Sequence, residues 1–472
     1  MITRDAIYID GAWVAPQGAG RGDVVNPATE EPLGRIPLSS AEDVDRAVRA
    51  AAAAQDVWAA TPADERAAAM RRIADGLAAR GEGLLELLIR EIGTPRQLAQ
   101  GMQYSVAVDV FREAADLLDE AAAEERVANS VVTREPVGVV GLIVPWNYPL
   151  YQAALKVAPA LATGCAVVLK PSAMATLSIY ILAEVIDEAR LPPGVFNLVT
   201  GEGAAVGEAL AAHPLIDMVS FTGSAAAGRR VAELAARNIT KVTLELGGKG
   251  ASVVLPDGDI EGAVVHATRS CFGNAGQTCA AMTRLIVPRA RLGEAEEAAR
   301  AAAAAYVPGD PLLPETRLGP LISADQRKRV RSYIETGERE GARAVAGGLD
   351  ASLVPARGYY VPATVFTDVR SEMTIAQEEI FGPVLAIEPV DDVGQAIRVA
   401  DGTPYGLTAS VWSADPDAAR AVGARLRVGS VNINGGKFNP SAPFGGRKES
   451  GYGRERGRFG LEEYLVPKAY HF

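Results

Sequence analysis

The sequence has few cysteines and few histidines. Among its 472 residues there are three of each, and an odd number of cysteines without regular spacing does not form a disulfide framework. We therefore expect free thiols and a reducing, cytoplasmic location. Three scattered histidines do not build a familiar zinc site, so no metal is expected. The residues concerned are Cys165, Cys271, Cys279, His213, His266 and His471.

Positive charge and long apolar runs are also scarce. The formal net charge is −11, whereas a nucleic-acid surface needs clustered positive charge and an anionic membrane attracts basic segments. No apolar run approaches the roughly 20 residues that a membrane helix needs, and the first residues lack the basic and apolar regions of a signal peptide. The strongest run, residues 137–146, is short and contains glycine and proline. We therefore predict neither a nucleic-acid partner nor a membrane partner.

The rest of the composition is that of an ordinary globular protein, with 48% hydrophobic and 22% charged residues. The length predicts two or three domains. The first part of the chain is rich in alanine and helical in pattern, because apolar residues recur there at helical spacing. The predicted helices are residues 47–60, 64–79 and 106–123.

Beyond residue 137 the pattern changes to strands that alternate with helices. The first strands are residues 137–144, 165–170, 195–199, 217–221 and 240–245, and the helices between them are 177–190, 204–212 and 224–237. This alternation favours right-handed crossovers and a mainly parallel sheet, as in a Rossmann-like dinucleotide-binding domain. A second series predicts another α/β domain, with strands at residues 252–255, 283–288, 364–366, 408–412 and 429–433.

Two residues indicate chemistry on a carbonyl group. Cys279 ends the run Gly276-Gln277-Thr278-Cys279, and Glu245 enters a diglycine turn upstream. A thiolate is the strongest side-chain nucleophile near neutral pH, and a carboxyl group with a raised pKa suits the activation of water. Cys165, in an apolar strand, and Cys271 are better explained as small buried hydrophobic residues.

The motifs around this pair resemble the aldehyde dehydrogenase superfamily, and the resemblance covers almost the whole chain. Residues 272–281 are similar to the nucleophile motif and residues 245–249 to the Glu-Leu-Gly-Gly-Lys motif. The resemblance implies that Cys279 attacks an aldehyde and that Glu245 is the general base. Asn147, in Pro145-Trp146-Asn147-Tyr148-Pro149, would stabilise the oxyanion together with the backbone N–H of Cys279.

The resemblance also implies a site for NAD or NADP. Phe221-Thr222-Gly223-Ser224 closes a strand and opens a helix, where backbone N–H groups attract a phosphate. Lys170 and Ser172 are similar to the segment that contacts the adenosine ribose. Glu379 and Phe381 are expected at the nicotinamide ribose and ring. Trp146 and Leu246 complete the expected cofactor-binding residues.

Ala173 departs from the family pattern. Many NAD-preferring members carry a Glu at this position, where its carboxylate accepts hydrogen bonds from the ribose hydroxyls and would repel a 2′-phosphate. The chain has alanine there, so we expect appreciable activity with NADP.

The substrate-binding residues are expected near the end of the chain. Residues 442–451 resemble the segment that flanks the family's substrate entrance, and Lys437, Phe438 and Phe444 are expected to face the tunnel. Tyr148, Tyr151 and Leu155 fall at roughly helical spacing and are expected on another wall. The sequence does not identify the aldehyde. A lone lysine at an entrance is more often simply solvated, so Lys437 does not by itself select an acidic substrate.

The resemblance thus implies an oxidoreductase that converts an aldehyde to a carboxylic acid through a thiohemiacetal and a thioester that water hydrolyses. Two alternatives stay open on the residues alone. One is a cysteine-dependent esterase or thioesterase, which would usually pair its cysteine with a histidine. The other is a non-catalytic structural protein that has kept the fold.

The resemblance further implies an α/β fold of three parts. Residues 1–123 and 138–246 are expected to form a Rossmann-like cofactor domain, and residues 247–447 a second α/β catalytic domain. Residues 124–137 and 462–472 are expected to form a small β arm for oligomerisation, so a homodimer or homotetramer is expected.

Overall fold

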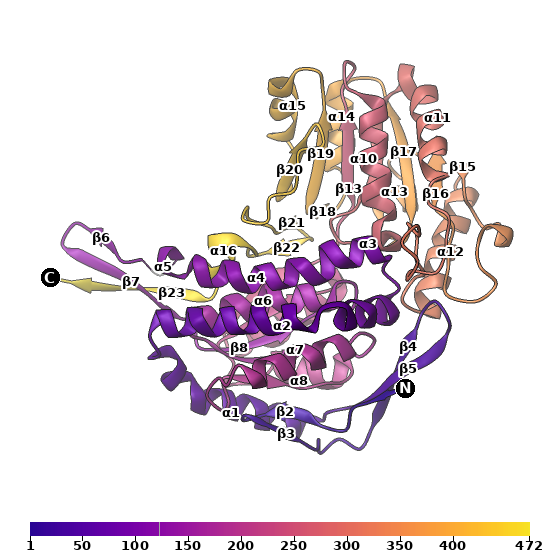
Figure 1. Cartoon of the computed structure of the whole chain (residues 1–472). Coiled ribbons are helices and arrows are strands. Elements are labelled where there is room, and N and C mark those ends of the chain that lie inside the picture. The colour runs from indigo at the N-terminus through magenta and orange to yellow at the C-terminus, as the bar shows by residue number, and fades with distance from the viewer. Residues whose placement is uncertain (122) are drawn as a thin grey trace.

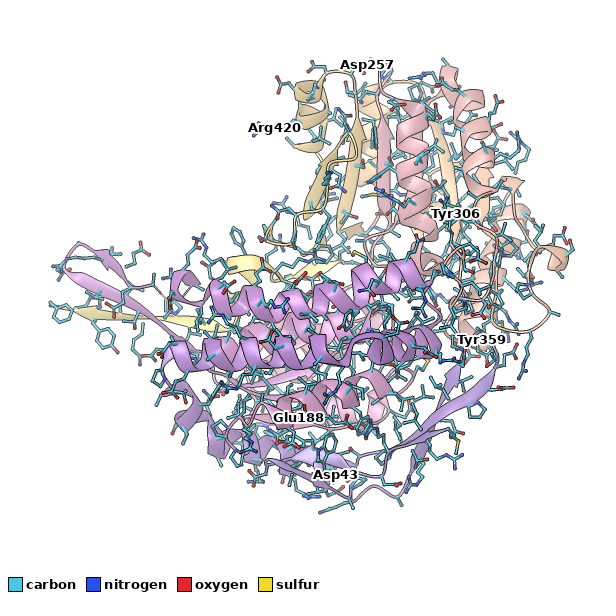
Figure 2. All side chains as sticks on the ribbon, viewed as in Figure 1. Asp43, Glu188, Asp257, Tyr306, Tyr359 and Arg420 are labelled. Atoms are coloured by element: carbon cyan, nitrogen blue, oxygen red, sulfur yellow. The ribbon has the colours of Figure 1, made fainter. Side chains whose placement is uncertain are left out.

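The computed structural model of the chain describes residues 1–121 and 123–472. Figure 1 shows two sheet-containing bodies and a narrow arm that carries the C-terminus. In Figure 2, Asp43 and Glu188 belong to the first body, and Asp257 and Arg420 lie at the far end of the second. Within the described ranges, no helix has both the length and the apolar character that a membrane span requires.

The first body contains an eight-stranded sheet in the order β22-β12-β11-β8-β9-β10-β2-β3. Its central strands run parallel, whereas β22, β2 and β3 pair antiparallel at the two edges. The parallel α/β arrangement that the alternating pattern predicts is therefore confirmed. The bounds are β2 (Ile7–Ile9), β3 (Ala12–Val14), β8 (Val139–Ile143), β9 (Ala166–Lys170), β10 (Phe196–Leu198), β11 (Met218–Thr222), β12 (Lys241–Glu245) and β22 (Gly451–Tyr452).

Helices cover both faces of this sheet, which explains why its central strands β8, β9 and β11 are buried along their whole length. Along β8, Val140 and Leu142 join one hydrophobic cluster, and Val139 and Ile143 join the cluster on the other face, because side chains alternate along a strand. One face carries α2 (Ala63–Ile92), α4 (Val106–Asp116), α6 (Pro149–Thr163) and α7 (Leu177–Glu188). The other carries α1 (Ala41–Ala59), the π-helical turn η2 (Gly203–Gly207), α8 (Glu208–Ala211) and α9 (Ala225–Ala236).

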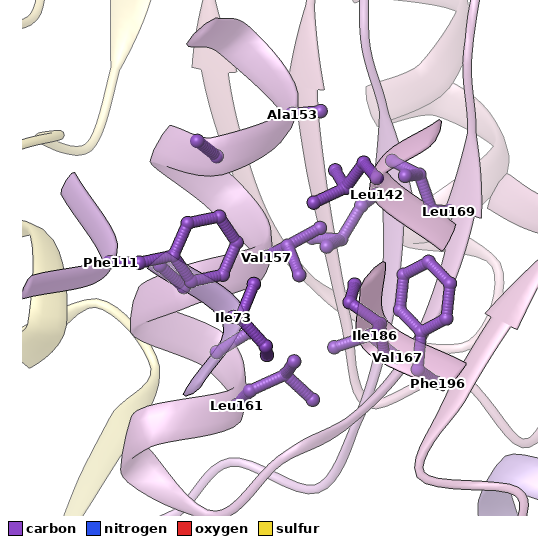
Figure 3. Packing of buried hydrophobic residues seen from close by; sticks show 14 of the residues in the cluster. Ile73, Phe111, Leu142, Ala153, Val157, Leu161, Val167, Leu169, Ile186 and Phe196 are labelled. Carbon is purple, nitrogen blue, oxygen red and sulfur yellow. The ribbon is translucent and has the colours of Figure 1, made fainter. Parts of the chain in front are cut away.

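Helix α6 is the central helix of the first body and is buried along its whole length. Figure 3 shows Val157 and Leu161 of α6 between Phe111 of α4 on one side and Leu142 of β8 and Val167 of β9 on the other. The helix begins at Pro149, immediately after the segment that holds Asn147. Its packing in the core therefore fixes the position of that segment.

The second body contains a seven-stranded sheet in the order β15-β16-β17-β14-β13-β19-β20, parallel except for β15. The strands are β13 (Gly250–Val254), β14 (Met282–Pro288), β15 (Arg343–Ala346), β16 (Thr364–Thr367), β17 (Val384–Val390), β19 (Thr408–Trp412) and β20 (Ser430–Ile433). Helices α10 (Ile260–Phe272), α11 (Leu292–Ala303), α12 (Ala324–Arg339) and α13 (Thr374–Gln377) pack on one face. Helices α14 (Val393–Asp401) and α15 (Pro416–Gly423) pack on the other.

A third sheet forms the arm, in the order β23-β7-β6. Its strands are β6 (Glu125–Val127), β7 (Ser130–Pro136) and β23 (Leu465–His471). β23 pairs antiparallel with β7 along its whole length, from Leu465 opposite Pro136 to His471 opposite Ser130. The two distant segments that were expected to share an arm therefore pair with each other.

Shorter elements complete the chain. Two small sheets contain β1 (Ile2–Thr3), β4 (Arg21–Asn26) and β5 (Glu31–Pro37), and β18 (Tyr405–Gly406) with β21 (Arg447–Lys448). The short helices and turns are α3 (Arg96–Ala99), η1 (Gln100–Ser105), α5 (Leu118–Ala121), η3 (Gly273–Gly276), η4 (Arg289–Arg291), η5 (Ala351–Leu353) and α16 (Gly457–Glu462).

Several local expectations differ from the structure. The first part of the chain is not helical throughout, because the strands β1 to β5 precede α1. The sequence pattern also misses β17, which lies inside the second sheet. The predicted helix 106–123 is divided between α4 and α5, and Ala122, which it includes, lies outside the described residues.

Candidate active site

The carboxyl ends of the central strands of the first sheet meet at one edge. Thr222, the last residue of β11, lies opposite Glu245, the last residue of β12. On the other side of β11, β8 ends at Ile143, shortly before Asn147. Ligands bind outside the carboxyl ends of parallel strands in open α/β sheets. The topology therefore places Asn147, Thr222 and Glu245 where a ligand is expected.

Cys279 follows the tight turn η3, which connects α10 to β14. Asn274 and Gly276 adopt left-handed φ angles of 52° and 75° in this turn. A Cβ atom on Gly276 would lie 2.1 Å from the backbone of Gly382, so only glycine fits. The side-chain amide of Asn274 donates a hydrogen bond of 3.0 Å to the backbone carbonyl of Asn147. The turn thus holds Cys279 against the segment that carries Asn147.

The side chain of Asn147 is buried and faces the same cavity as Cys279. Its Nδ2 donates to the backbone carbonyl of Gln277 at 2.9 Å, and its backbone carbonyl accepts from Nε2 of Gln103 at 3.0 Å. An amide nitrogen has two hydrogens, so one remains for a ligand oxygen. This arrangement can stabilise a negative charge that develops beside the sulfur.

Glu245 is buried, and neither oxygen of its carboxyl group has a hydrogen-bond partner within the described structure. Burial raises the pKa of Glu245 well above its usual range, and the carboxylate of Glu455 raises it further. Lys156, Arg454 and Arg456 oppose this effect without cancelling it. The carboxyl group is therefore poised to take up a proton.

Lys156 and Glu455 form a buried ion pair beside Glu245. Nζ of Lys156 donates to Oε1 of Glu455 at 2.7 Å and to the hydroxyl of Ser220 at 2.9 Å. This pair was not predicted from the sequence, because Lys156 lies in α6 and Glu455 near the end of the chain. A lysine in an otherwise apolar helix was the available signal.

Burial raises the pKa of the Cys279 thiol to about 12, and the carboxylates of Glu245, Glu379 and Glu455 contribute to this rise. The thiol is therefore protonated at neutral pH in this structure. A nucleophilic sulfur must lose its proton as it attacks, so the attack requires a proton acceptor, such as a water molecule, beside Cys279.

A first cavity of about 190 Å³ leads to Cys279 from the edge of the first sheet. It is lined by several residues predicted to bind the cofactor: Trp146, Thr222, Gly223, Ser224, Leu246, Glu379 and Phe381. The rings of Trp146 and Phe381 meet edge to face with centroids 5.4 Å apart.

These residues fit a dinucleotide. The buried hydroxyl of Thr222 has no hydrogen-bond partner within the described structure. A Cβ on Gly223 would lie 2.5 Å from the Phe221 ring, so the backbone at the start of α9 stays bare. Glu379 accepts a hydrogen bond of 2.9 Å from the backbone N–H of Gly248, which orients its carboxylate. A bare helix start and an oriented carboxylate suit a phosphate and a ribose, respectively.

The remaining predicted cofactor residues do not line this cavity. Lys170 ends β9 and is buried, and burial lowers its pKa to about 8. Ser172 and Ala173 follow it and are half-buried. Phe221 belongs to a hydrophobic cluster beneath Gly223.

Two residues of α12 line the cofactor cavity but were not predicted from the sequence. Gln326 and Arg329 are one helical turn apart and face it together. Arg329 donates from Nη2 to the backbone carbonyl of Glu379 at 2.8 Å. Nothing near these two residues in the sequence signals a ligand, since α12 otherwise reads as an ordinary polar helix.

A second cavity of about 370 Å³ reaches Cys279 and contains every predicted substrate-binding residue. These residues are Tyr148, Tyr151, Lys437, Phe438 and Phe444. Leu155 and Met102 add apolar surface, and the Tyr148 hydroxyl lies 2.8 Å from that of Thr278. Among the described lining residues, Cys279 alone belongs to both cavities.

The geometry combines a thiol, an amide donor and a buried carboxyl group around one cavity junction, which suits acyl chemistry on a carbonyl group. His266 lines the second cavity, but its ring packs edge-on against Trp412, with centroids 5.7 Å apart, and burial lowers its pKa. No histidine–Cys279 hydrogen bond occurs within the described structure. Nor do its histidines, cysteines and carboxylates form a cluster of three or more that could hold a metal ion.

Comparison with known proteins gives matches along nearly the whole chain. The family model described as "Aldehyde dehydrogenase family" matches residues 13–470. A 3-succinoylsemialdehyde-pyridine dehydrogenase of Pseudomonas sp is 46% identical over 463 residues, which cover 98% of this chain and 97% of that protein. A geranial dehydrogenase of Castellaniella defragrans is 42% identical over 470 residues, with 98% of each covered.

Solved structures are similar as well. A mutant of aldehyde dehydrogenase C from Pseudomonas syringae, in complex with NAD+ and octanal, superposes with a TM-score of 0.96 at 46% identity, covering 99% of this chain and 96% of that one. A Mycobacterium tuberculosis aldehyde dehydrogenase complexed with NAD+ gives a TM-score of 0.96 at 42% identity, covering 100% and 98%.

Proposed function

The chain belongs to the aldehyde dehydrogenase family and oxidises an aldehyde with NAD(P), and we propose that Cys279, Asn147 and Glu245 carry the reaction. The observation that supports these roles is the junction of two cavities at Cys279. Asn147 and Glu245 lie on the cofactor side of this junction, and the apolar cavity opens on the other side. Neither an esterase nor a structural protein explains a cavity that fits a dinucleotide.

In the first step, the sulfur of Cys279 attacks the aldehyde carbon and its thiol proton passes to a water molecule, so this step does not require Glu245. The carbonyl π electrons move to the oxygen, giving a thiohemiacetal. Nδ2 of Asn147 and the backbone N–H of Cys279 donate to this oxygen, and such donors lower the barrier in a site that excludes water. Trp146, Thr222, Gly223, Ser224, Leu246, Glu379 and Phe381 would hold the nicotinamide cofactor, which when bound would accept the hydride from the thiohemiacetal carbon and so leave a thioester on Cys279.

In the second step, the acyl group is released from the sulfur. The carboxylate of Glu245 takes a proton from a water molecule, and the oxygen of that water attacks the thioester carbon. The carbon–sulfur bond then breaks, giving the carboxylic acid and the Cys279 thiolate. The raised pKa of Glu245 suits this role, because it makes the carboxylate a stronger base than an ordinary glutamate.

The nucleophile is tested by replacing each cysteine. We expect Cys279→Ala to lower the rate of aldehyde-dependent reduction of NAD by about a thousandfold or more, because covalent catalysis is lost. Cys165→Ala and Cys271→Ala should remain active, since both thiols are fully buried in hydrophobic clusters. Absorbance of the reduced cofactor measures all three rates. Near-normal turnover by Cys279→Ala would refute the mechanism.

We also propose the division of the chain into functional parts. Residues 1–123 and 138–246 form the cofactor domain, residues 247–447 the catalytic domain, and residues 124–137 with 462–472 the oligomerisation arm of a homodimer or homotetramer. The separate sheets support this division. A cytoplasmic location is supported by three free cysteines, two of them buried.

A further inference from the structure

The substrate cavity contains an arginine that the reaction does not use. The Arg456 guanidinium lines this cavity and lies over three aromatic rings. Its carbon Cζ is 4.0 Å from the ring centroid of Phe438, 5.0 Å from that of Phe444 and 5.3 Å from that of Tyr151. Nε and Nη1 are buried without a hydrogen-bond partner in the described structure. Buried donors of this kind normally have partners.

The backbone at Arg456 is also unusual. Its φ of 77° and ψ of 152° lie in a region that is almost restricted to glycine. Such a conformation costs free energy and persists when the surrounding structure enforces it. Here it directs a long cationic side chain into the cavity.

The charges around the cavity favour an anion. Lys437 is exposed at the cavity and adds a second cation, and no aspartate or glutamate occurs among the described lining residues. Two carboxylates that act electrostatically on this region belong to other interactions: Glu455 pairs with Lys156, and Glu245 faces the cofactor cavity. In a protein with a formal net charge of −11, this local excess of positive charge is a specific feature.

We propose that Arg456 binds the carboxylate of an aldehyde whose far end is anionic, so that the substrates are ω-oxo carboxylic acids. This inference rests on the proposed function, with Cys279 attacking the aldehyde group at one end of the cavity. The apolar side chains of Leu155 and Met102 surround the methylene chain between the two ends.

Binding of a substrate carboxylate would replace the cation–π contact between Arg456 and Phe438 with a stronger interaction. Phe438, the ring closest to the guanidinium, is 53% exposed, so it can move aside without opening the core. A cation–π contact is weaker than charge-assisted hydrogen bonds from a guanidinium to a carboxylate. The entering carboxylate therefore replaces the ring as the partner of Arg456.

The test compares matched aldehydes with the full-length enzyme. Succinate semialdehyde, 6-oxohexanoate and 8-oxooctanoate are each paired with the alkanal of equal length, and kcat/KM is measured for every member. We expect the carboxylated aldehyde to be preferred about tenfold or more at the best length. If no aldehyde is oxidised, the proposed function itself fails. If alkanals are oxidised as well as or better than their carboxylated partners, only the present inference fails.

A substitution of Arg456 tests whether this residue causes the preference for carboxylated aldehydes. Arg456→Met keeps an unbranched side chain against the rings, and it should lower the ratio of carboxylated to neutral kcat/KM about 10- to 100-fold, mainly through KM. Arg458→Met is the matched control, because Arg458, on α16, is exposed and pairs with Glu120 of α5 and with Glu462 of α16. The control should keep the wild-type ratio.

Arg456 also lies within electrostatic range of Glu245. If Arg456 acted only through Glu245, Arg456→Met would lower kcat equally for the carboxylated and the neutral aldehyde. The ratio of their kcat/KM values would then stay unchanged, which would overturn the proposal.

Inhibition of the wild type tests the proposal even if Arg456→Met does not fold. Adipate should compete with 6-oxohexanoate at least about tenfold more strongly than hexanol does, and equal inhibition would also overturn the proposal.

Discussion

At the scale of single residues, Glu245 combines deep burial with an absence of hydrogen-bond partners. Glu245→Gln should therefore fold normally, because no hydrogen bond is lost, yet it cannot take a proton from water. We expect a burst of about one reduced cofactor per active site, followed by a stall of the acyl-enzyme. Stopped-flow absorbance measures the burst. If Glu245→Gln kept the wild-type steady-state rate, another group would be the base. Because water is the expected acyl acceptor, added coenzyme A should not accelerate the wild type.

Ala173 offers a second test at this scale. Without a carboxylate at this position, nothing there repels a 2′-phosphate, so the wild type should show appreciable activity with NADP. Ala173→Glu should shift the ratio of kcat/KM toward NAD about tenfold or more, mostly through loss of NADP activity. Steady-state kinetics with both cofactors measures this ratio. A wild type that ignores NADP, or a ratio that does not move, would indicate that another residue reads the ribose.

The sequence predicts the reacting residues around Cys279 better than the buried ion pair next to Glu245. Cys279, Asn147 and Glu245 lie in short motifs, and the structure brings all three to one cavity; their roles stay predictions. Lys156 and Glu455 were missed, because a buried ion pair between positions 299 apart in the chain leaves no local pattern.

At the scale of elements, one carboxyl group connects two helices. Helix α7 has no side-chain cap of its own. Instead Glu91, near the end of α2, accepts hydrogen bonds from the backbone N–H groups of Leu177 and Ser178 and from the Ser178 hydroxyl at 2.7 Å. Glu91→Ala would leave these buried donors unpaired and should lower the free energy of unfolding by about 2–4 kcal/mol. Urea denaturation measures this loss, and an unchanged midpoint would contradict it.

Glu91 also predicts a pH dependence of stability. Burial raises its pKa from the ordinary value of 4.5 to about 7, although its hydrogen bonds oppose this rise. The folded state therefore holds a proton that the unfolded state releases. The resulting stabilisation is present below pH 4.5 and is lost as the pH rises through about 7. The unfolding free energy of the wild type relative to Glu91→Gln should fall between about pH 4.5 and 7; a constant or rising difference would exclude this.

The elements that sequence patterns missed are those with the weakest local signals. β17 contains Glu388 and Pro389, which argue against a central strand, but Arg284 neutralises the buried Glu388 from the neighbouring β14. The first five strands have two to seven residues each and pair mainly with one another, and among them β2 also pairs with the distant strand β10. Mostly apolar strands that are buried on both faces, such as β8 and β9, were found at nearly the correct bounds.

At the scale of the whole molecule, the arm extends away from both bodies (Figure 1). Val466 and Tyr470 of β23 and Phe472, which follows the strand, are exposed. They are separated by even numbers of residues, so they share one face of the strand. An arm with exposed apolar side chains suits pairing with another copy.

The oligomeric state tests this use of the arm. We expect the wild type to be a dimer or tetramer by light scattering, and Val466→Glu with Tyr470→Glu to shift its mass toward the monomer, because charge would be buried in the interface. The matched control is Val57→Glu with Val307→Glu, two exposed valines outside the arm, which should leave the mass unchanged. A monomeric wild type, or an arm variant of unaltered mass, would contradict this assignment.

The two cavities that meet at Cys279 have a consequence for how this enzyme can diversify. Cys279 is the single described residue that lines both cavities. Residues that line the substrate cavity can therefore be substituted without changing the residues that line the cofactor cavity. Mutations can therefore give the enzyme a new aldehyde substrate while its cofactor site stays the same. Relatives named for a pyridine semialdehyde and for geranial, at 46% and 42% identity, illustrate such divergence around one architecture.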